Sequence, residues 1–380
     1  MKTTIKKFKD IVIVFAITIF LLELVSFAIL KIHSINQYTG TGLLIFKQTS
    51  KNGHIEVSKS SVLPIKENIS VQNSTDEFNT MINTNNRGLR EKFNVNNKDI
   101  DVAFFGDSWT FGYGVNDNER YSYIFSQDTF FLKSKVVNFS YINGFQPEHY
   151  EYYLHINADL HPKNVIIGLY LGNDFDSDIE ETNYDWKNNS LSIPYRFVSS
   201  NGALYNNPVV YNFPFNYLVD VSSFVKLVVI MINKTNYRDY LFNNELKVPV
   251  NNPNRVDLEL GKEDLAKNRA IQSLIRIQKI VKERGGKLTI LLIPQNYFFD
   301  SNSKRPHIHR NLKNRINEVK QGNNILKATK KILAKLCIDY YDPSIIMNQQ
   351  YYYKTDGHWN SKGHSIIGSE LAKYIKERYY

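Results

Sequence analysis

The longest apolar run of the chain lies close to its N-terminus. Between Ile11 and Leu30 nearly every position is apolar, and the interruptions are Thr18, Glu23 and Ser26. Twenty helical residues extend about 30 Å, which is enough to cross the hydrocarbon core of a bilayer. Lysines precede the run, so the positive-inside rule predicts a cytoplasmic N-terminus and an extracytoplasmic remainder. A cleaved signal peptide is the alternative, but the length of the run favours a retained anchor.

From about residue 100 onward the apolar positions form short runs that are typical of buried strands. The runs cover residues 101–105, 135–139, 164–171, 287–293 and 337–341. Strands of a parallel sheet that is covered on both faces are apolar along their whole length, and these runs fit that description. The last run contains the single cysteine, Cys337, which we therefore expect to be a buried strand residue.

Helical periodicity separates the later runs. Ala270, Leu274, Ile277 and Val281 recur at helical spacing, and the glycines that follow at 285 and 286 suit a helix end. Residues 325–336 and 366–375 read as two further helices. Strands that alternate with helices predict an α/β fold, namely a three-layer α/β/α sandwich with a parallel sheet. In such folds functional residues lie on loops at the carboxyl ends of the strands.

Two segments depart from this alternation and suggest the domain limits. We expect residues 1–33 to form the cytoplasmic N-terminus and anchor, 34–98 a polar juxtamembrane stalk and entry segment, and 99–380 the α/β domain, with an insertion at about 176–262. Long connections of this kind often form lids or binding surfaces. The aromatic residues of the insertion could stack on sugar rings or form a small core of their own; they are Trp186, Tyr195, Phe197, Tyr211, Phe213, Phe215 and Tyr217.

The composition narrows the choice of partners. The net charge is +10, but residues 262–335 hold 18 Lys and Arg against 5 Asp and Glu, so the rest of the chain is net negative. This basic segment could face anionic headgroups or an anionic polymer, although solvated helix faces are the simpler interpretation. A domain outside the membrane is not expected to bind nucleic acid. With one cysteine the chain forms no internal disulfide.

Three short motifs carry the candidate chemistry. Gly106-Asp107-Ser108 follows the first apolar run, Gly172-Asn173-Asp174 follows the third, and Asp356-Gly357-His358 lies near the C-terminus. A serine on a sharp turn after a buried strand presents its hydroxyl for nucleophilic attack. An imidazole can accept and return the proton, and a carboxylate can orient the ring, so Ser108, His358 and Asp356 are the predicted catalytic residues.

The order of these motifs resembles the SGNH (GDSL-type) hydrolase and acyltransferase superfamily. The resemblance covers roughly residues 85–380. It implies a serine nucleophile in the first block, an oxyanion-binding Asn173 in a later block, and the Asp356/His358 pair in the last. Family members often space that pair Asp-x-x-His, whereas here one residue separates them. The Gly112-Tyr113-Gly114-Val115 tail and the string from Asp356 to Asn360 look like membrane-anchored members that are linked to cell-surface polysaccharides.

The oxyanion of a tetrahedral intermediate needs preorganised donors. The resemblance implies the backbone N–H of Ser108, the side chain of Asn173 and a backbone N–H from a second block. Val136-Val137-Asn138 resembles that block, whose glycine would fall at Asn143, with Gly144 next. We assign this donor to Gly144, with Asn143 as the alternative.

These observations lead to one main hypothesis and two alternatives. The resemblance implies a membrane-anchored serine esterase or O-acyltransferase that acts on acyl esters, with acetyl as the expected group, of an extracytoplasmic glycan. A membrane acyltransferase is a candidate partner. One alternative is a non-catalytic polysaccharide-binding or scaffold protein on the same fold, and the other is a lipase or thioesterase at the membrane surface. No cofactor is expected, and the pair His307 and His309 is too small a set to predict a metal site.

Overall fold

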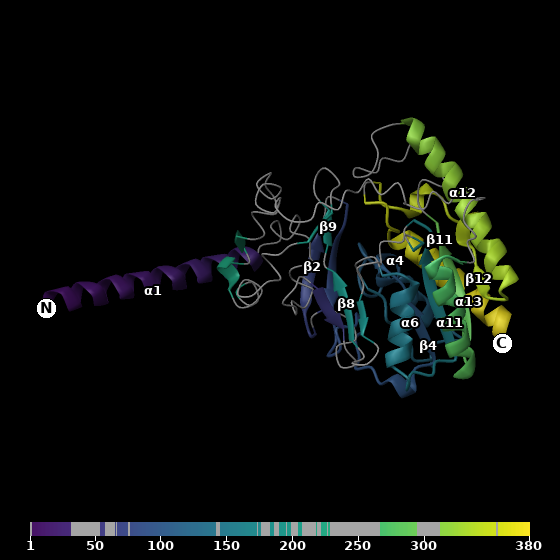
Figure 1. Cartoon of the computed structure of the whole chain (residues 1–380), viewed down its shortest axis with the longest axis horizontal. Coiled ribbons are helices and arrows are strands. Elements are labelled where there is room, and N and C mark those ends of the chain that lie inside the picture. Colours follow the sequence, from purple (N-terminus) through teal and green to yellow (C-terminus); the bar gives the residue numbers. More distant parts are fainter. Residues whose placement is uncertain are drawn as a thin grey trace.

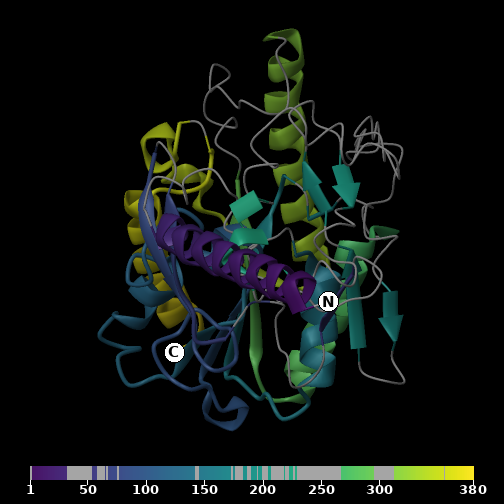
Figure 2. The same cartoon turned by 90° about the vertical axis from the view of Figure 1, so that its left-hand side faces the viewer.

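The computed structural model describes most of the core and parts of the flanking segments. It describes residues 2–31, 54–57, 65, 67–74, 77–141, 145–172, 174–175, 183–185, 190–194, 196–198, 204–206, 218, 222–225, 227–228, 267–294, 312–354 and 356–380. Figure 1 shows α1 (Lys2–Lys31) pointing away from the body, with the C-terminus at the opposite end of the molecule. Figure 2 views the body from the side on which α1 projects.

A five-stranded parallel sheet forms the centre of the body. Its strands are β4 (Val102–Phe105), β5 (Val136–Asn138), β6 (Asn164–Tyr170), β11 (Lys287–Ile293) and β12 (Asp339–Tyr341). Their spatial order is β12-β11-β6-β4-β5, and every neighbouring pair is parallel. The chain therefore moves outward from β4 in one direction and then returns to build the other half. In doubly wound sheets ligands bind at this reversal, beyond the carboxyl ends of the two central strands, which here are β4 and β6.

Helices cover both faces of the sheet, so the fold is the three-layer α/β/α sandwich that the sequence predicts. Their bounds are α4 (Ser108–Phe111), α5 (Tyr121–Ser126), α6 (Pro147–Ile156), α11 (Arg269–Glu283), α12 (Leu312–Lys335) and α13 (Ser361–Tyr379). Successive strand residues point to opposite faces. Ala103 and Phe105 join a core with α6, α11 and α12, whereas Val102 and Phe104 join a second core with α5 and α13.

The five predicted strands are confirmed, and so are the three predicted helices. The last strand is shorter than expected because Leu336 and Cys337 form a turn before it. Cys337 has a left-handed φ of 54° and is exposed, so the expectation of a buried strand residue was wrong. The helices α4, α5 and α6 were not predicted. Of these, α6 carries three tyrosines and two glutamates, which hide its apolar spacing.

Part of the segment assigned to the stalk packs on the body. Strands β2 (Ser70–Ser74) and β3 (Asn79–Asn83) form an antiparallel hairpin, and a short 3-10 turn, η1, covers Asn97–Asp99. Ile65, Ile82 and Leu89 are at most 1% exposed and belong to the first core. The hairpin lies between α1 and the main sheet in Figure 1. Residues from about 65 onward therefore contribute to the body.

Short strands accompany the insertion. Strand β8 (Ser190–Pro194) pairs antiparallel with β7 (Asn183–Asp185) and with β1 (His54–Val57), which precedes the body in sequence. Strands β9 (Arg196–Val198) and β10 (Leu204–Asn206) form a second antiparallel pair. The aromatic side chains proposed to stack on sugars lie outside the residues whose side chains are described.

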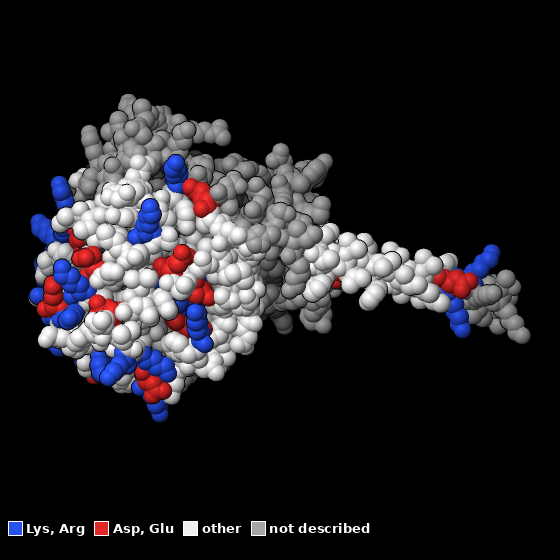
Figure 3. All heavy atoms as spheres, turned by 180° about the vertical axis from the view of Figure 1, so that it is seen from behind, with Lys and Arg blue, Asp and Glu red and all other residues white. Residues whose placement is uncertain are grey.

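One described helix, α1, is long and apolar enough to cross a membrane, with a candidate span of Lys9–Ile29. A signal sequence near an N-terminus has the same character. Figure 3 shows the shaft of α1 largely free of charge between its charged tip and the body. On the body itself, Lys and Arg are interspersed with Asp and Glu over the face that Figure 3 shows, which fits solvated surfaces.

Candidate active site

Ser108 follows the central strand β4 and is the first residue of α4. Asp107 precedes it as the N-cap, and its Oδ1 accepts a hydrogen bond from the backbone N–H of Trp109 at 3.0 Å. A carboxylate at this position satisfies one of the N–H groups that a helix start leaves without an intrahelical partner. The cap turns the chain sharply, so the Ser108 hydroxyl stands at the carboxyl end of β4.

The turn requires a residue without a side chain at position 106. A Cβ on Gly106 would lie 1.9 Å from Oγ1 of Thr110, which sits one helical turn ahead. A Cβ on Gly168, in the adjacent strand β6, would meet the same oxygen at 2.2 Å. The two glycines therefore let α4 lie directly against the strand ends, with Thr110 held by a hydrogen bond from Tyr121.

The loop before α13 brings Asp356 and His358 to Ser108. The Ser108 Oγ lies 2.8 Å from Nε2 of His358, across 250 positions of sequence. On the other side of the ring, Nδ1 lies 2.5 Å from Oδ1 of Asp356. An aspartate can only accept, so Nδ1 carries the proton and Nε2 is free to accept from the serine hydroxyl. The three predicted residues thus form one continuous chain of hydrogen bonds.

Gly357 explains how an Asp-x-His spacing can work. Its φ is +86°, a left-handed conformation that other residues rarely adopt. The resulting tight turn also lets the backbone N–H of His358 donate to Oδ1 of Asp356 at 3.2 Å. One oxygen of the carboxylate therefore contacts both the ring and the backbone of the histidine, which limits the rotation of the ring.

Two aromatic side chains from the serine segment enclose the imidazole. The ring centroids of Trp109 and His358 are 4.7 Å apart, and those of Tyr113 and His358 are 5.1 Å apart. The His358 side chain remains 20% exposed, so it is held from two sides and still open to a substrate. Burial and the nearby Asp356 carboxylate raise the pKa of Tyr113 to about 12, so its hydroxyl stays protonated.

Asp107 is a second carboxyl close to the histidine, but it does not bind the ring. It is 1% exposed, and this burial raises its pKa to about 7, while the neighbouring His358 opposes the shift. Its contact with the Trp109 N–H gives it a structural role in the turn. Asp356, which is 23% exposed, is the carboxylate that touches the imidazole.

The hairpin of β2 and β3 contacts residues of this site. The Phe78 ring packs against Tyr113 at 5.4 Å and against Tyr353 at 5.1 Å between centroids. Glu77, next to it, accepts a hydrogen bond from the backbone N–H of Asp356. The sequence analysis did not identify these two residues, because no motif links the hairpin to the last block.

Arg90, in the entry segment, organises the chain that follows α4. Its guanidinium is buried, bonds Asp117 at 2.5 Å and donates to four backbone carbonyl oxygens. Those carbonyls belong to Met81, Phe111, Gly112 and Val115. These contacts give Arg90 a structural role in the segment that follows α4.

The second block is held by Asn138, which ends β5 and is 2% exposed. Its side-chain amide donates to the carbonyl oxygen of Thr110 at 2.7 Å and to Oγ of Ser122 at 2.9 Å. These bonds fix the β5 end against α4. The predicted oxyanion donor that follows it, Gly144, and its alternative Asn143 both lie outside the described residues.

The third block is anchored by Asp174. This buried carboxylate accepts the backbone N–H of Tyr170 at 2.7 Å, and its own N–H donates to the Tyr170 carbonyl. The loop after β6 is thereby closed at the same edge of the sheet as Ser108. Asn173, the predicted oxyanion residue, lies outside the described residues, and so do His307 and His309.

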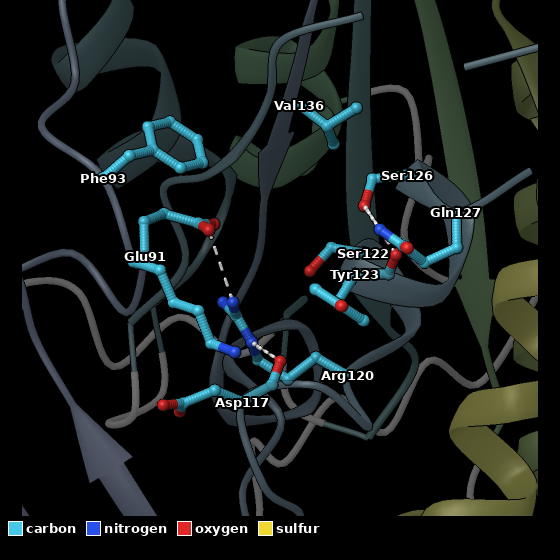
Figure 4. Close-up of a pocket in the computed structure, with 10 residues that line it drawn as sticks. Glu91, Phe93, Asp117, Arg120, Ser122, Tyr123, Ser126, Gln127 and Val136 are labelled. Carbon is cyan, nitrogen blue, oxygen red and sulfur yellow. Dashed lines mark hydrogen bonds and ion pairs between the residues drawn. The ribbon is translucent and has the colours of Figure 1, made fainter. Parts of the chain in front are cut away.

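A cavity of about 190 Å³ lies outside the group formed by Ser108, His358 and Asp356. Arg120 points into it and bonds the carboxylate of Glu91 at 3.4 Å and the carbonyl oxygen of Asp117 at 3.0 Å (Figure 4). Ser108 and His358 are not among its lining residues. Of its charged groups, Arg120 pairs with Glu91, and the Asp117 carboxylate pairs with Arg90. Over the described part of the chain, no three metal-ligating side chains gather as a metal site.

Comparison with known proteins finds matches among solved structures. No family model matches the sequence, and no curated protein matches it. Among solved structures, a lipase/acylhydrolase from Enterococcus faecalis matches with 14% identity and a TM-score of 0.36, over 73% of this chain and 96% of its own. A GDSL-like lipase from Bacteroides thetaiotaomicron matches with 10% identity and a TM-score of 0.35, over 74% of this chain and 91% of its own. Such likenesses describe the path of the chain and carry no information on its substrate.

Proposed function

We propose that this protein is a serine-dependent ester hydrolase or acyl transferase of the SGNH type. The hydrogen-bonded chain from Ser108 through His358 to Asp356 is the observation that supports it. The Ser108 oxygen attacks an ester carbonyl while its proton moves to Nε2 of His358. Asp356 stabilises the imidazolium, which then gives the proton to the leaving alcohol, and an acyl-serine remains.

The second half of the reaction depends on which hydroxyl compound reaches the acyl-serine. Water, deprotonated by Nε2, releases a carboxylic acid and restores the serine, whereas a sugar hydroxyl would take the acyl group instead. The Ser108 backbone N–H lies in the first turn of α4, where N–H groups have no intrahelical partner, so it can donate to the oxyanion. We assign the remaining oxyanion donors to Asn173 and Gly144.

For the substrate and location we propose acyl, mainly acetyl, esters of an extracytoplasmic glycan, with α1 retained as a membrane anchor. The support is the apolar span Lys9–Ile29 behind an N-terminal lysine cluster, together with the resemblance of the serine and histidine blocks to anchored polysaccharide-modifying proteins. A membrane acyltransferase that supplies the acyl group is the partner that a transfer reaction would require.

The first experiment measures turnover of p-nitrophenyl acetate by the full-length protein in detergent. Ser108→Ala should lower kcat/KM by about a thousandfold or more, and His358→Ala by a similar factor. Ser361→Ala, which changes an exposed serine, is the matched control and should leave turnover unchanged. Mass spectrometry should find the acyl group on the peptide that contains Ser108. Equal turnover by wild type and Ser108→Ala would exclude this nucleophile.

Hydrolysis and transfer are then separated with an acetylated glycan oligomer as acyl donor and a deacetylated one as acceptor. A hydrolase should release acetate at a rate that the acceptor does not change. A transferase should move the acetyl group to the acceptor and release less acetate in its presence. If neither product forms and the Ser108→Ala variant still binds the oligomer, a glycan-binding role on this fold is the better description.

A further inference from the structure

Glu23 lies within the apolar stretch of α1 and contacts the insertion, about two hundred positions away. Its carboxylate accepts a hydrogen bond from the hydroxyl of Ser222. It also accepts the backbone N–H groups of Ser223 at 2.7 Å and of Phe224 at 3.3 Å. Helical residues begin at Ser223, so the Glu23 side chain caps the first turn of a short helical stretch within the insertion.

The contact involves one face of α1. Ser26, three positions after Glu23, is 3% exposed, and residues three apart share a face of a helix. Leu24, which points to another face of α1, is 54% exposed. Ser222, Ser223 and Phe224 therefore contact α1 near its C-terminal end. The earlier turns of α1 extend away from the body, as Figure 1 shows.

The position of the contact along α1 gives its depth. Glu23 precedes the end of the candidate span, Ile29, by six residues, which places it about 9 Å inside the apolar segment at 1.5 Å per residue. If α1 spans the bilayer, the residues that hydrogen-bond Glu23 lie at the same depth. Two apolar side chains of this part of the insertion are exposed, namely Leu218 at 36% and Phe224 at 37%.

The energetics favour such an arrangement in lipid. A carboxylate within a membrane span is costly because it leaves water. Backbone N–H groups that enter hydrocarbon without an acceptor are also costly. When Glu23 accepts from Ser223 and Phe224, each group removes the penalty of the other. The described residues that follow the capped N–H groups are apolar, namely Val225, Leu227 and Val228.

We propose that the turn formed by Ser222, Ser223 and Phe224 enters the outer leaflet beside α1, with Glu23 as its helix cap and lipid acyl chains against Leu218 and Phe224. The protein would then be held by two elements, and Glu23 would be a structural link between the anchor and the body. This inference rests on the proposed retention of α1 in the membrane. It is independent of the esterase chemistry, so the p-nitrophenyl acetate assay and the test below can fail separately.

The test measures the depth of a label at position 224. The full-length chain carries Phe224→Cys and Cys337→Ser, and the thiol receives an environment-sensitive fluorophore before reconstitution into phosphatidylcholine vesicles. Lipids with a nitroxide on the acyl chain should quench this label about twofold or more, because nitroxides quench only at short range within the hydrocarbon. The same fluorophore on the native Cys337, an exposed residue at the far end of the body, should show no such quenching.

Two variants of Glu23 test the cap. Glu23→Gln keeps an acceptor oxygen and should retain the quenching at position 224. Glu23→Leu makes α1 more apolar but removes the acceptor, so the quenching should fall to the level of the Cys337 control. Quenching that Glu23→Leu leaves unchanged would contradict the role of the cap.

Other results would overturn the lipid contact itself. A label at position 224 that acyl-chain nitroxides do not quench places the segment outside the hydrocarbon. If such a label is also shielded from water-soluble quenchers, a protein covers the segment instead. A mature chain purified from cells without residues 1–31 would remove the anchor and, with it, the whole proposal.

Discussion

The Glu77 carboxylate accepts a hydrogen bond from the backbone N–H of Asp356 at 2.7 Å, although 279 positions separate the two residues. The contact joins the β2–β3 hairpin to the loop that carries Asp356 and His358. The neighbouring Phe78 packs on Tyr113, which itself lies against the imidazole. The hairpin therefore holds the loop of Asp356 and His358, and this early part of the chain is coupled to the geometry of the candidate site.

Glu77 should act as a positioning residue. Glu77→Ala removes the acceptor of the Asp356 N–H, so we expect kcat to fall about tenfold to a hundredfold while KM changes little, because the misplacement affects the reacting groups rather than ester binding. Glu77→Gln keeps an acceptor oxygen and should restore most of kcat. Steady-state kinetics on p-nitrophenyl acetate measure both. Glu377→Ala, an equal charge change on the exposed end of α13, is the control, and an equal effect there would argue against positioning.

Gly357 and Gly285 form a matched pair for testing the histidine turn. Both have a left-handed φ, +86° and +76°, and a Cβ on Gly285 would meet nothing within 4 Å. Each Gly→Ala change should destabilise the protein by about 1 kcal/mol through backbone strain, as denaturant unfolding can measure. Gly357→Ala should also lower kcat, because the turn places Asp356 on the ring. If both variants keep full activity, the turn does not control the Asp356–His358 contact.

Arg90 should be irreplaceable by lysine. Its buried guanidinium bonds Asp117 and four carbonyl oxygens, which a lysine with three donors on one nitrogen cannot reproduce. We expect Arg90→Lys to cost about 3–5 kcal/mol of unfolding free energy. Arg276→Lys, at a half-exposed ion pair with Glu151, should cost less than about 1 kcal/mol. Urea unfolding of both variants measures this difference, and similar costs would contradict it.

His149 should make the fold sensitive to acid. Burial lowers the pKa of this imidazole from 6.5 to about 4. Between these values the unfolded chain binds a proton that the folded chain does not, so stability is complete above pH 6.5 and falls as the pH decreases towards 4. His149 Nδ1 also accepts the backbone N–H of Gln146 in a capping box, a role that glutamine can fill.

His149→Gln should therefore keep the cap and remove the titration. We expect the slope of unfolding free energy against pH to decrease by up to about 1.4 kcal/mol per pH unit between pH 6.5 and 4. Urea unfolding of wild type and variant at several pH values gives the two slopes. Parallel slopes would show that His149 does not titrate differently in the two states.

The elements that the sequence predicted well are those with a strong local pattern. Strands β4, β6 and β11 are apolar throughout, and α11 shows regular helical spacing. The misses have local causes as well. α5 has only six residues, and α6 is dense in tyrosine and charged residues, so neither shows a clear apolar period. Cys337 was misplaced because its apolar neighbours resemble a strand, while the chain turns there in a left-handed conformation.

Ser108, His358 and Asp356 could be selected as candidates because each sits in a short motif that follows a strand or precedes a helix, and the structure brings the three together. The supporting residues were not. Glu77 and Phe78 lie in a polar segment with no sustained pattern, and their partners are far away in sequence. The same holds for Glu23. Its place in an apolar run did not indicate that Ser222, Ser223 and Phe224 donate hydrogen bonds to its carboxylate.

Local chemistry along the chain was enough to indicate the α/β layers, the apolar N-terminal helix and the choice of Ser108, Asp356 and His358 as candidate site residues. These features depend on residue type and short-range spacing, which the linear order retains. The doubly wound strand order, the meeting of Ser108 with His358 across 250 positions and the contacts of the hairpin required the folded chain. They depend on packing between distant segments, whose partners are chosen by complementary shape and by buried polar groups that must be paired, and no local pattern records that choice.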